Sequence, residues 1–170
     1  MQALPRDQLV TDWVASRFPD QSIEITPASA DASFRRYFRL RQADGNTRIL
    51  MDAPPDKEDC RPFIHVAGLL AKAGLAAPRV LDQDLKNGFL LLTDLGRVGY
   101  LDALNADLSL ADTLMRPVLD VLIDWQLSTR ASTLPPYDAT LLRRELDLFP
   151  EWFVGRHLGY VLSDEEKSML

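Results

Sequence analysis

The sequence predicts an α+β protein, in which a β-rich first half is followed by a second half that is entirely helical. Short runs of alternating apolar and polar residues, separated by turn residues, occupy the stretch from residue 22 to residue 95. From Tyr100 onward the apolar residues recur at helical spacing instead. The 170 residues can bury a real core, and the change of pattern predicts two lobes joined near residues 93–99.

The first half is expected to begin with a helix and to continue with a hairpin. Residues 6–18 place Leu9, Trp13 and Val14 at helical spacing, and a Pro-Asp pair ends the run. Three strands are predicted next, at 22–26, 33–40 and 47–52. An Asp-Gly turn separates the second strand from the third, which is typical of a hairpin.

The strand predicted at 33–40 has two unlike faces, because side chains alternate across a strand. One face carries Phe34, Phe38 and Leu40 with Arg36 among them, and the other carries Arg35, Tyr37 and Arg39.

A helix and two further strands complete the predicted sheet region. The helix covers about 61–73 and stops at Gly74, and the strands cover 79–84 and 88–95. The last strand is a continuous apolar run, as expected of a strand buried on both faces. Helices are expected at 108–129, 138–149, 150–160 and 162–170, the last with Ser163 as its N-cap and Glu166 three residues on.

Composition limits the class of protein. The formal net charge of -6 argues against non-specific binding to nucleic acid or to an anionic membrane surface. The single cysteine, Cys60, excludes an internal disulfide framework and fits a reducing compartment. The N-terminus lacks the pattern of a secretory signal, and the apolar runs are too short to span a bilayer. We therefore expect a cytoplasmic protein.

Arginines are concentrated in one short segment of this acidic chain. Between residues 33 and 48 a single acid, Asp44, stands against Arg35, Arg36, Arg39, Arg41 and Arg48. One interpretation is an edge strand protected by charge against aggregation. The other is an anion site, in which the small-residue loop 28–33 brings backbone N–H groups close to a polyphosphate and Arg35 or Arg36 supplies positive charge. The stretch "LTDLG" (92–96) would then be a connector whose peptide groups pair with an adenine edge.

Four strings carry a family resemblance: "ASFRRYFRL", "MDAPPDKEDCRPF", "GFLLLTDLG" and "LLRRELDLFPEWF". They resemble the aminoglycoside-phosphotransferase-type kinases, and within them the bacterial kinases that phosphorylate N-acetylmuramate and N-acetylglucosamine at the anomeric hydroxyl during cell-wall recycling. The resemblance runs from about Leu9 to Phe153, and the second string is the most diagnostic. It implies a protein-kinase-like small lobe at 1–92, a hinge at 93–99 and the start of a helical large lobe at 100–170. It also implies ATP and Mg²⁺ as cofactors, and ATP and an amino sugar as small-molecule partners.

The resemblance also implies which residues of this chain bind ligands. The nucleotide-binding set is Ser33, Phe34, Arg35, Arg36, Lys57, Thr93, Asp94 and Leu95. The set that would contact the sugar is Arg144, Glu145 and Trp152, where the carboxylate would accept hydroxyl groups and the indole would stack on a pyranose ring. For this second set, packing in the helical core is the competing interpretation.

The sequence departs from the family pattern at two places. Met51 stands where kinases carry a strand lysine, and the following helix has no acid at its middle, so Arg35, Arg36, Arg48 or Lys57 would have to substitute. Neither His65 nor His157 is followed by aspartate two residues on, so the catalytic loop is missing. We expect an N-terminal portion without catalytic or metal-binding residues, with the Mg²⁺ ligands beyond residue 170 and little or no activity by itself.

Several signals have simpler interpretations, and other functions remain open. The acids of residues 52–59 are expected to form a solvated loop rather than a cation site, Cys60 to be structural, and His65 to be a packed or surface residue. Another small-molecule kinase of the same superfamily, acting on an aminoglycoside, choline or homoserine, would share the scaffold. A non-catalytic nucleotide-binding or interaction module is the alternative from a different class.

Overall fold

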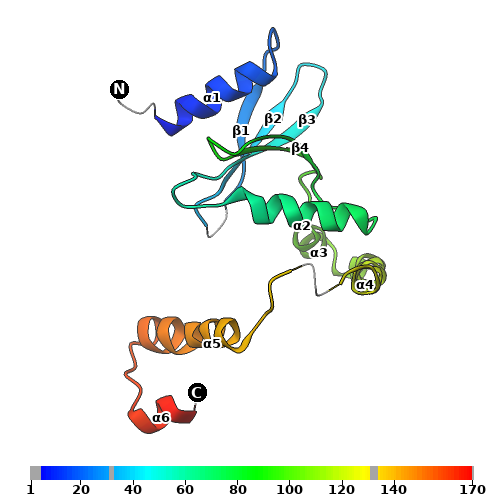
Figure 1. The fold of residues 1–170 in the computed structure, drawn as a ribbon. Coiled ribbons are helices and arrows are strands. Elements are labelled where there is room, and N and C mark those ends of the chain that lie inside the picture. The colour runs from blue at the N-terminus through cyan, green and yellow to red at the C-terminus, as the bar shows by residue number, and fades with distance from the viewer. Residues whose placement is uncertain (1–4, 31–32, 131–133, 170) are drawn as a thin grey trace. The chain divides into compact units, whose positions relative to one another are not determined.

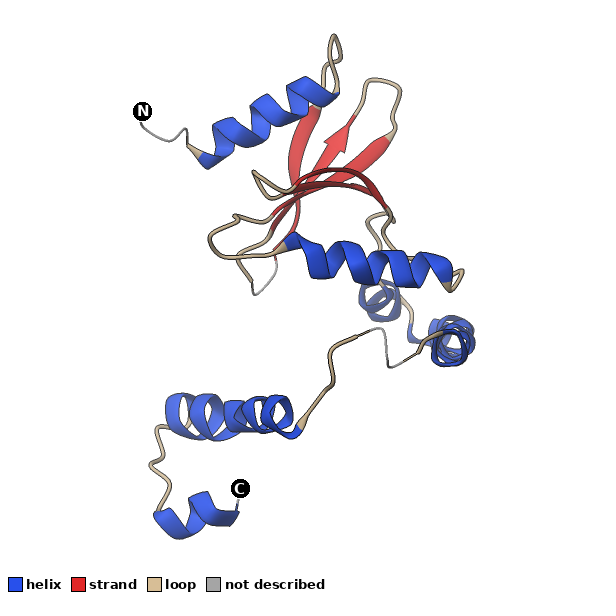
Figure 2. Ribbon diagram, viewed as in Figure 1, coloured by secondary structure: helices blue, strands red, loops and turns tan. Residues whose placement is uncertain are grey.

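A computed structural model of the protein describes residues 5–30, 33–130 and 134–169. It divides into two compact units, residues 1–129 and residues 130–170. The first unit contains a five-stranded antiparallel sheet with helices, and the described part of the second unit contains helices only (Figure 2). The predicted α+β class, with the sheet of a kinase-like small lobe, is therefore confirmed.

The sheet has the strand order β1-β2-β3-β5-β4, with every neighbouring pair antiparallel. Its strands are β1 (Glu24–Ala30), β2 (Arg36–Arg41), β3 (Thr47–Asp52), β4 (Val80–Asp84) and β5 (Phe89–Thr93). Four successive apolar residues of β5, Phe89 to Leu92, are buried, because β5 has a strand on each side and a helix over each face. The prediction of a central buried strand at this position is confirmed.

One helix packs on each face of the sheet (Figure 1). On the first face, α1 (Arg6–Arg17) buries Val10, Trp13 and Val14 against alternate side chains of β2, β3 and β5. On the second face, α2 (Cys60–Lys72) covers Met51, Leu90 and Leu92. Alternation therefore places Arg36, Phe38 and Leu40 on the α1 face, and Arg35, Tyr37 and Arg39 on the α2 face, as predicted.

The expected small-residue loop at 28–33 is corrected by the structure. Residues 28–30 belong to β1, where Ser29 pairs with Tyr37, and a register shift follows Pro27. Residues 31 and 32 lie outside the described residues, and a bend at Ser33 and Phe34 leads into β2. Small residues do not by themselves indicate a loop, because an edge strand tolerates them where its partner supplies the hydrogen bonds.

The helices after the sheet follow the predictions with two differences. A short helix, α3 (Tyr100–Ala106), occupies a segment for which no element was predicted. The single helix expected at 108–129 is a 3₁₀ turn, η1 (Leu108–Leu110), followed by α4 (Ala111–Ser128) with Pro117 inside it. The preceding Asp107 accepts the N–H of Ser109 at 2.9 Å and so favours the separate turn.

The second unit consists of three helical elements in its described part. These are α5 (Ala139–Leu148), the π-helix η3 (Phe149–His157) and α6 (Asp164–Met169). The predicted cap of α6 is confirmed, because Ser163 Oγ accepts the N–H of Glu166 at 3.2 Å and Glu166 Oε2 accepts the N–H of Ser163 at 2.8 Å. Across the described residues of both units, no helix has the length and apolarity that crossing a bilayer requires.

Candidate functional site

A cavity of about 520 Å³ opens on the α2 face of the sheet, where β5 leaves the sheet and becomes a connector. Its volume lies in the range of small-molecule sites in proteins. Its walls come from β1, β2, β3, β5, α2 and the connector: Ala28, Ser29, Tyr37, Arg39, Ile49, Phe63, Pro78, Leu92 and residues 93–99. Apolar and aromatic side chains therefore face the peptide groups of residues 93–99. Such a site suits a flat apolar ring with a hydrogen-bonding edge.

The predicted connector residues Thr93, Asp94 and Leu95 all line this cavity. Thr93 is the last residue of β5, and its hydroxyl accepts the N–H of Arg79 at 3.0 Å. Leu95 is 65% exposed, which is unusual for a leucine beside a buried strand. Their binding of a nucleotide stays a prediction, and the structure shows that they share one concave surface.

Arg39 and Asp94 form an ion pair at the edge of the cavity. Arg39 Nε donates to Asp94 Oδ2 at 2.6 Å and Nη2 donates to Oδ1 at 3.0 Å, which is bidentate geometry. Only 11% of the Arg39 side chain and 5% of the Asp94 side chain are exposed. The hydrogen bond from Arg39 is the chief reason that the pKa of Asp94 lies well below its usual range.

A second ion pair on the same face joins Arg35 to Glu58. Arg35 Nε and Nη2 each lie 3.2 Å from Glu58 Oε2, just before α2 begins. Burial opposes the charge of Arg35, yet its hydrogen bonds with Tyr37 and Glu58 leave its pKa above the ordinary value. Arg35 immediately precedes β2, and its hydrogen bond with Tyr37, which lines the cavity, places the guanidinium beside this wall.

The loop residues Ser33, Phe34 and Lys57 lie beside this pair. Ser33 Oγ accepts the N–H of Arg35 at 3.1 Å, and Lys57 Nζ lies 5.9 Å from the centre of the Phe34 ring. Phe34 is 63% exposed, so the ring is available for contact with a ligand. The structure thus brings four of the predicted nucleotide-binding residues together, while their role stays a prediction.

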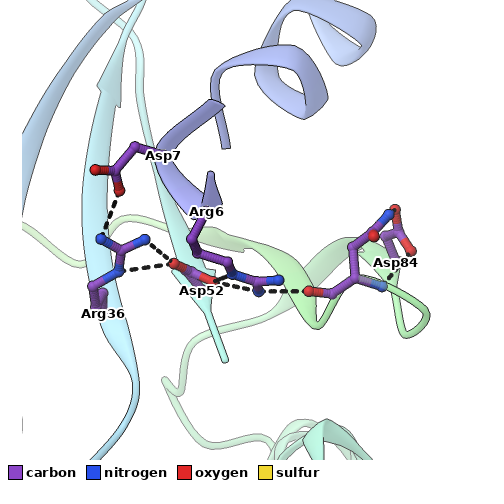
Figure 3. A network of polar contacts seen from close by, with 6 residues as sticks. Arg6, Asp7, Arg36, Asp52 and Asp84 are labelled. Carbon is purple, nitrogen blue, oxygen red and sulfur yellow. Dashed lines mark hydrogen bonds and ion pairs between the residues drawn. The ribbon is translucent and has the colours of Figure 1, made fainter. Parts of the chain in front are cut away.

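Arg36 lies elsewhere, on the face of the sheet that α1 covers. Its Nη2 donates to Asp52 Oδ2 at 2.6 Å and its Nη1 donates to Asp7 at 2.7 Å (Figure 3). Asp52 is fully buried, and Arg6 Nε donates to its other oxygen at 2.7 Å. Arg36 therefore helps to attach α1 to the sheet, and the structure does not bring it to the cavity.

The acids of residues 52–59 have separate partners, and two of them depart from the solvated loop expected from the sequence, because Asp52 is buried in β3 and the Glu58 side chain is only 15% exposed. Asp52 pairs with arginines, Glu58 pairs with Arg35, and Asp59 caps α2 by accepting the N–H of Arg61 at 2.9 Å. Cys60 is the first residue of α2, its thiol is buried, and this burial raises the pKa of the thiol. In the described part of the chain, no group of three or more His, Cys, Asp or Glu side chains is placed to hold a metal ion.

The predicted sugar-binding residues all lie in the second unit, where Arg144 lines a shallow cavity with Arg143 and Asp147. Arg144 Nη2 and Glu145 Oε1 are 2.9 Å apart, and Arg156 stacks 4.0 Å from the centre of the Trp152 ring. Trp152 is 53% exposed. A cavity of about 560 Å³ in this unit is lined by other residues, among them Arg143, Asp147, Glu151, Tyr160 and Lys167. Packing of these side chains in a helical core stays the competing interpretation.

Sequence reasoning missed most of the cavity wall, in particular Tyr37, Arg39, Ile49 and Phe63. A signal was present for two of them, because strand alternation places Tyr37 and Arg39 on the same face as Arg35. Nothing in the sequence pairs Arg39 with Asp94, which lies 55 positions further along the chain.

Comparison with known proteins extends this picture. Residues 24–166 match the phosphotransferase enzyme family. Relatives named N-acetylmuramate/N-acetylglucosamine kinase include one from Pseudomonas aeruginosa, 51% identical over 94% of this chain and 49% of that protein. A second, from Pseudomonas putida, is 51% identical over 85% of this chain and 42% of that protein. A third, from Neisseria meningitidis, is 34% identical over 98% of this chain and 50% of that protein. The chain spans about half the length of these curated relatives. The family match covers most of the chain, so the chain belongs to the phosphotransferase enzyme family.

Proposed function

We propose that the complete protein containing this chain is an ATP-dependent phosphotransferase that phosphorylates an amino sugar at its anomeric hydroxyl. The observation that carries the proposal is the cavity between the α2 face of the sheet and the connector, in a chain of the phosphotransferase enzyme family. The relatives' names support N-acetylmuramate and N-acetylglucosamine as acceptors. In this proposal residues 1–92 are the small lobe, 93–99 the hinge and 100–170 the start of the large lobe.

The cavity would hold the purine of ATP. Tyr37, Phe63 and Leu92 offer the apolar and aromatic surface on which a flat ring can be buried, and the peptide groups of residues 93–95 offer donors and acceptors to its edge. An apolar wall with a few well-placed polar groups both buries the ring and fixes its orientation.

Arg35 is the cation that we place near the phosphates. Its hydrogen bond with Tyr37 keeps the side chain on the cavity face, and Glu58 holds the guanidinium in place, much as an acidic partner holds the strand lysine of other kinases. Ser33, Phe34 and Lys57 would border the same end of the nucleotide. Arg36 is left out of this set because two carboxylates on the opposite face already bind it.

The contribution of this chain to catalysis would be positioning and charge stabilisation. A transferred phosphoryl group passes through a loose transition state, so holding the phosphates in line and neutralising their charge accounts for most of the rate enhancement. The described residues contain no group of three or more His, Cys, Asp or Glu side chains that could hold Mg²⁺, so the roles proposed here belong to other side chains and to peptide groups. Arg144, Glu145 and Trp152 are proposed to contact the sugar, by hydrogen bonds from its hydroxyls to Glu145 and by stacking on the indole.

The cellular setting of the proposal is the cytoplasm, with small-molecule partners. A single, buried cysteine suits a reducing compartment. The net charge of -6 favours neither nucleic acid nor an anionic membrane as a partner.

The test is a substrate panel on the complete protein with ATP. We expect N-acetylmuramate and N-acetylglucosamine to be converted to sugar 1-phosphates, identified by phosphorus NMR, and the reaction to stop when a chelator removes divalent metal. Phosphorylation of choline, homoserine or an aminoglycoside in place of the amino sugars would refute the acceptor assignment. Absence of phosphoryl transfer to any acceptor would refute the enzyme assignment.

The phosphate assignment has its own test, in the KM for ATP. Arg35→Gln should raise this KM about tenfold, because a charge-assisted hydrogen bond to phosphate is lost, while the KM for the sugar stays unchanged. Arg41→Gln is the matched control, since Arg41 is an exposed arginine at the far end of β2 and pairs only loosely with Glu24, at 3.7 Å. An unchanged KM for ATP in Arg35→Gln would remove Arg35 from the site.

A further inference from the structure

The Arg39–Asp94 pair connects the middle of the sheet to the connector at the wall of the cavity. Arg39 belongs to β2, Asp94 is the first residue after β5, and both line the cavity. Beyond the two bonds to Asp94, Arg39 Nη2 donates to the carbonyl oxygen of Gly96 at 2.7 Å. One guanidinium therefore contacts two residues of the connector at once.

Asp94 in turn binds the connector's own backbone. Its Oδ1 accepts the N–H of Gly96 at 2.9 Å, and its carboxylate also accepts a hydrogen bond from the side chain of Thr47 on β3. Gly96 has a φ of 104°, a conformation that a residue with a side chain rarely adopts. The backbone N–H and the carbonyl oxygen of Gly96 are thus both hydrogen-bonded, and these bonds hold the turn after Asp94 in one conformation.

This arrangement determines which peptide groups remain for a ligand. Gly96 cannot offer its N–H or its carbonyl to a ring in the cavity without breaking the bonds to Asp94 or Arg39. In the described part of the chain, no hydrogen bond uses the backbone N–H or carbonyl of Leu95, which also lines the cavity. The backbone groups of Arg97 and Val98 are likewise unused in the described residues, but Leu95 is the one of the three that lies inside the turn held by Arg39 and Asp94.

We propose that Arg39 is a positioning residue for nucleotide binding, which fixes the turn at 94–96 so that Leu95 presents its N–H and carbonyl to the purine edge. The inference rests on the proposed ATP-binding function. Arg39 does not itself touch the nucleotide in this account. It acts through Asp94 and Gly96, and it thereby sets both the affinity for ATP and the preference for adenine over guanine, whose edge offers a different pattern of donors and acceptors.

A purely structural role is the competing explanation, in which the pair merely joins the ends of two strands. The two explanations differ in where the damage appears. A structural pair would weaken the whole sheet when it is broken, whereas a positioning residue would loosen the connector and leave the strands unchanged.

The first experiment measures amide hydrogen exchange in the 170-residue chain. Arg39→Gln should speed exchange at the Gly96 amide about tenfold or more, since the bonds that hold this turn are lost, while β3 and β5 keep their protection. Arg41→Gln should change neither region. Uniformly faster exchange across the sheet would overturn the inference, as would unchanged exchange at Gly96.

The second experiment measures kinetics of the complete protein. Arg39→Gln should raise the KM for ATP about tenfold and narrow the ratio of kcat/KM between ATP and GTP, with kcat and the KM for the sugar unchanged. Arg39→Lys keeps the charge but not the forked geometry, so it should recover only part of the ATP affinity. If the unaltered protein transfers no phosphoryl group, the proposed function fails while the exchange experiment still decides the role of Arg39 in the connector. If it uses ATP normally and Arg39→Gln leaves the KM for ATP unchanged, or if both Arg39 variants fail to fold, the inference itself is wrong.

Discussion

The sheet region and the helical region of this chain differ sharply in burial. With the exception of Val154, every buried residue of the described chain lies between residues 10 and 92. The helices from Tyr100 onward carry large apolar side chains that are mostly exposed, such as Leu127 at 80%. The sheet and its two helices therefore have their own core, whereas the later helices are stabilised mainly by bonds within each helix.

This difference teaches where stability and site geometry come from. Burial of apolar surface is the dominant favourable contribution to folding, and short helices without a packed face are marginal in water. The ion pairs that define the candidate site, Arg39–Asp94 and Arg35–Glu58, both lie in the sheet region. We therefore expect the nucleotide end of the site to be pre-formed by the sheet, and the proposed sugar end to depend on the helices.

The largest expected effect is on the buried charge that attaches α1 to the sheet. Asp52→Ala leaves Arg6 and Arg36 without their shared carboxylate and should lower the free energy of unfolding by about 3–5 kcal/mol. Urea denaturation monitored by circular dichroism measures the loss. Asp56→Ala is the control, because the exposed carboxylate of Asp56 makes only a long ion pair of 3.7 Å with the adjacent, exposed Lys57. Equal losses in the two variants would contradict a core stabilised by Asp52.

Substitution of one glycine in each region tests how tightly the backbone of that region is packed. Gly88, next to β5, and Gly159, in the helical region, have similar positive φ angles of 71° and 64°. A Cβ on Gly88 would lie 1.8 Å from the carbonyl oxygen of Ala53, while one on Gly159 would meet nothing within 4 Å. Gly88→Ala should therefore cost about 2–4 kcal/mol, and Gly159→Ala about 1 kcal/mol, from backbone strain alone. Thermal denaturation of both variants measures the difference, and similar costs would show that the sheet region is not the more tightly packed.

The Arg39–Asp94 pair should give the sheet region a pH dependence with a definite sign. The folded pKa of Asp94 is depressed, so its stabilising contribution is complete above the unfolded pKa of about 3.9 and is lost as the pH falls below that value. At neutral pH, Asp94→Asn should lower the free energy of local opening of the 94–96 turn by about 1.5–3 kcal/mol, measured by amide exchange at Gly96, while β3 and β5 keep their protection. The gap between the two proteins should narrow as the pH is lowered from about 5 toward 2. A gap that stays constant over this range would show that the carboxylate charge is not involved.

The smallest effect is expected at the cap of α6, in the helical region. Ser163→Ala removes the oxygen that accepts the N–H of Glu166, so the amide of Glu166 should exchange faster while β5 is unaffected. Ser168→Ala is the control, because Ser168 Oγ only donates to the carbonyl of Glu165 within the helix, at 2.7 Å. If the cap variant also loosened β5, the two regions would not be as independent as their burial indicates.

Much of the local structure could be predicted because it depends on neighbours in the sequence. The Asp-Gly hairpin turn, the two faces of β2 and the Ser163 cap follow from alternation and from short-range hydrogen bonds. The course of residues 28–30 could not be predicted, because small residues join a strand only when a partner strand is present.

The candidate site was only half predictable for the same reason. The connector residues 93–95 were predicted from the string that follows the buried apolar run, and the structure places them at the cavity. Arg35 and Arg36 were equivalent from composition, yet adjacent strand positions face opposite sides of a sheet, and only Arg35 faces the cavity side.

By itself, the sequence determined the order of the elements, the side to which each strand residue points and the family to which the chain belongs. These properties depend on residue type and local spacing, which the chain carries in one dimension. Only the tertiary structure decided that β5 inserts between β3 and β4, that Arg39 reaches Asp94 and that Arg36 serves α1. Such contacts join positions far apart in the chain. Both faces of the sheet are buried, so the strands must pair in the register that gives each inward-facing charge a partner, because an unpaired buried charge is costly.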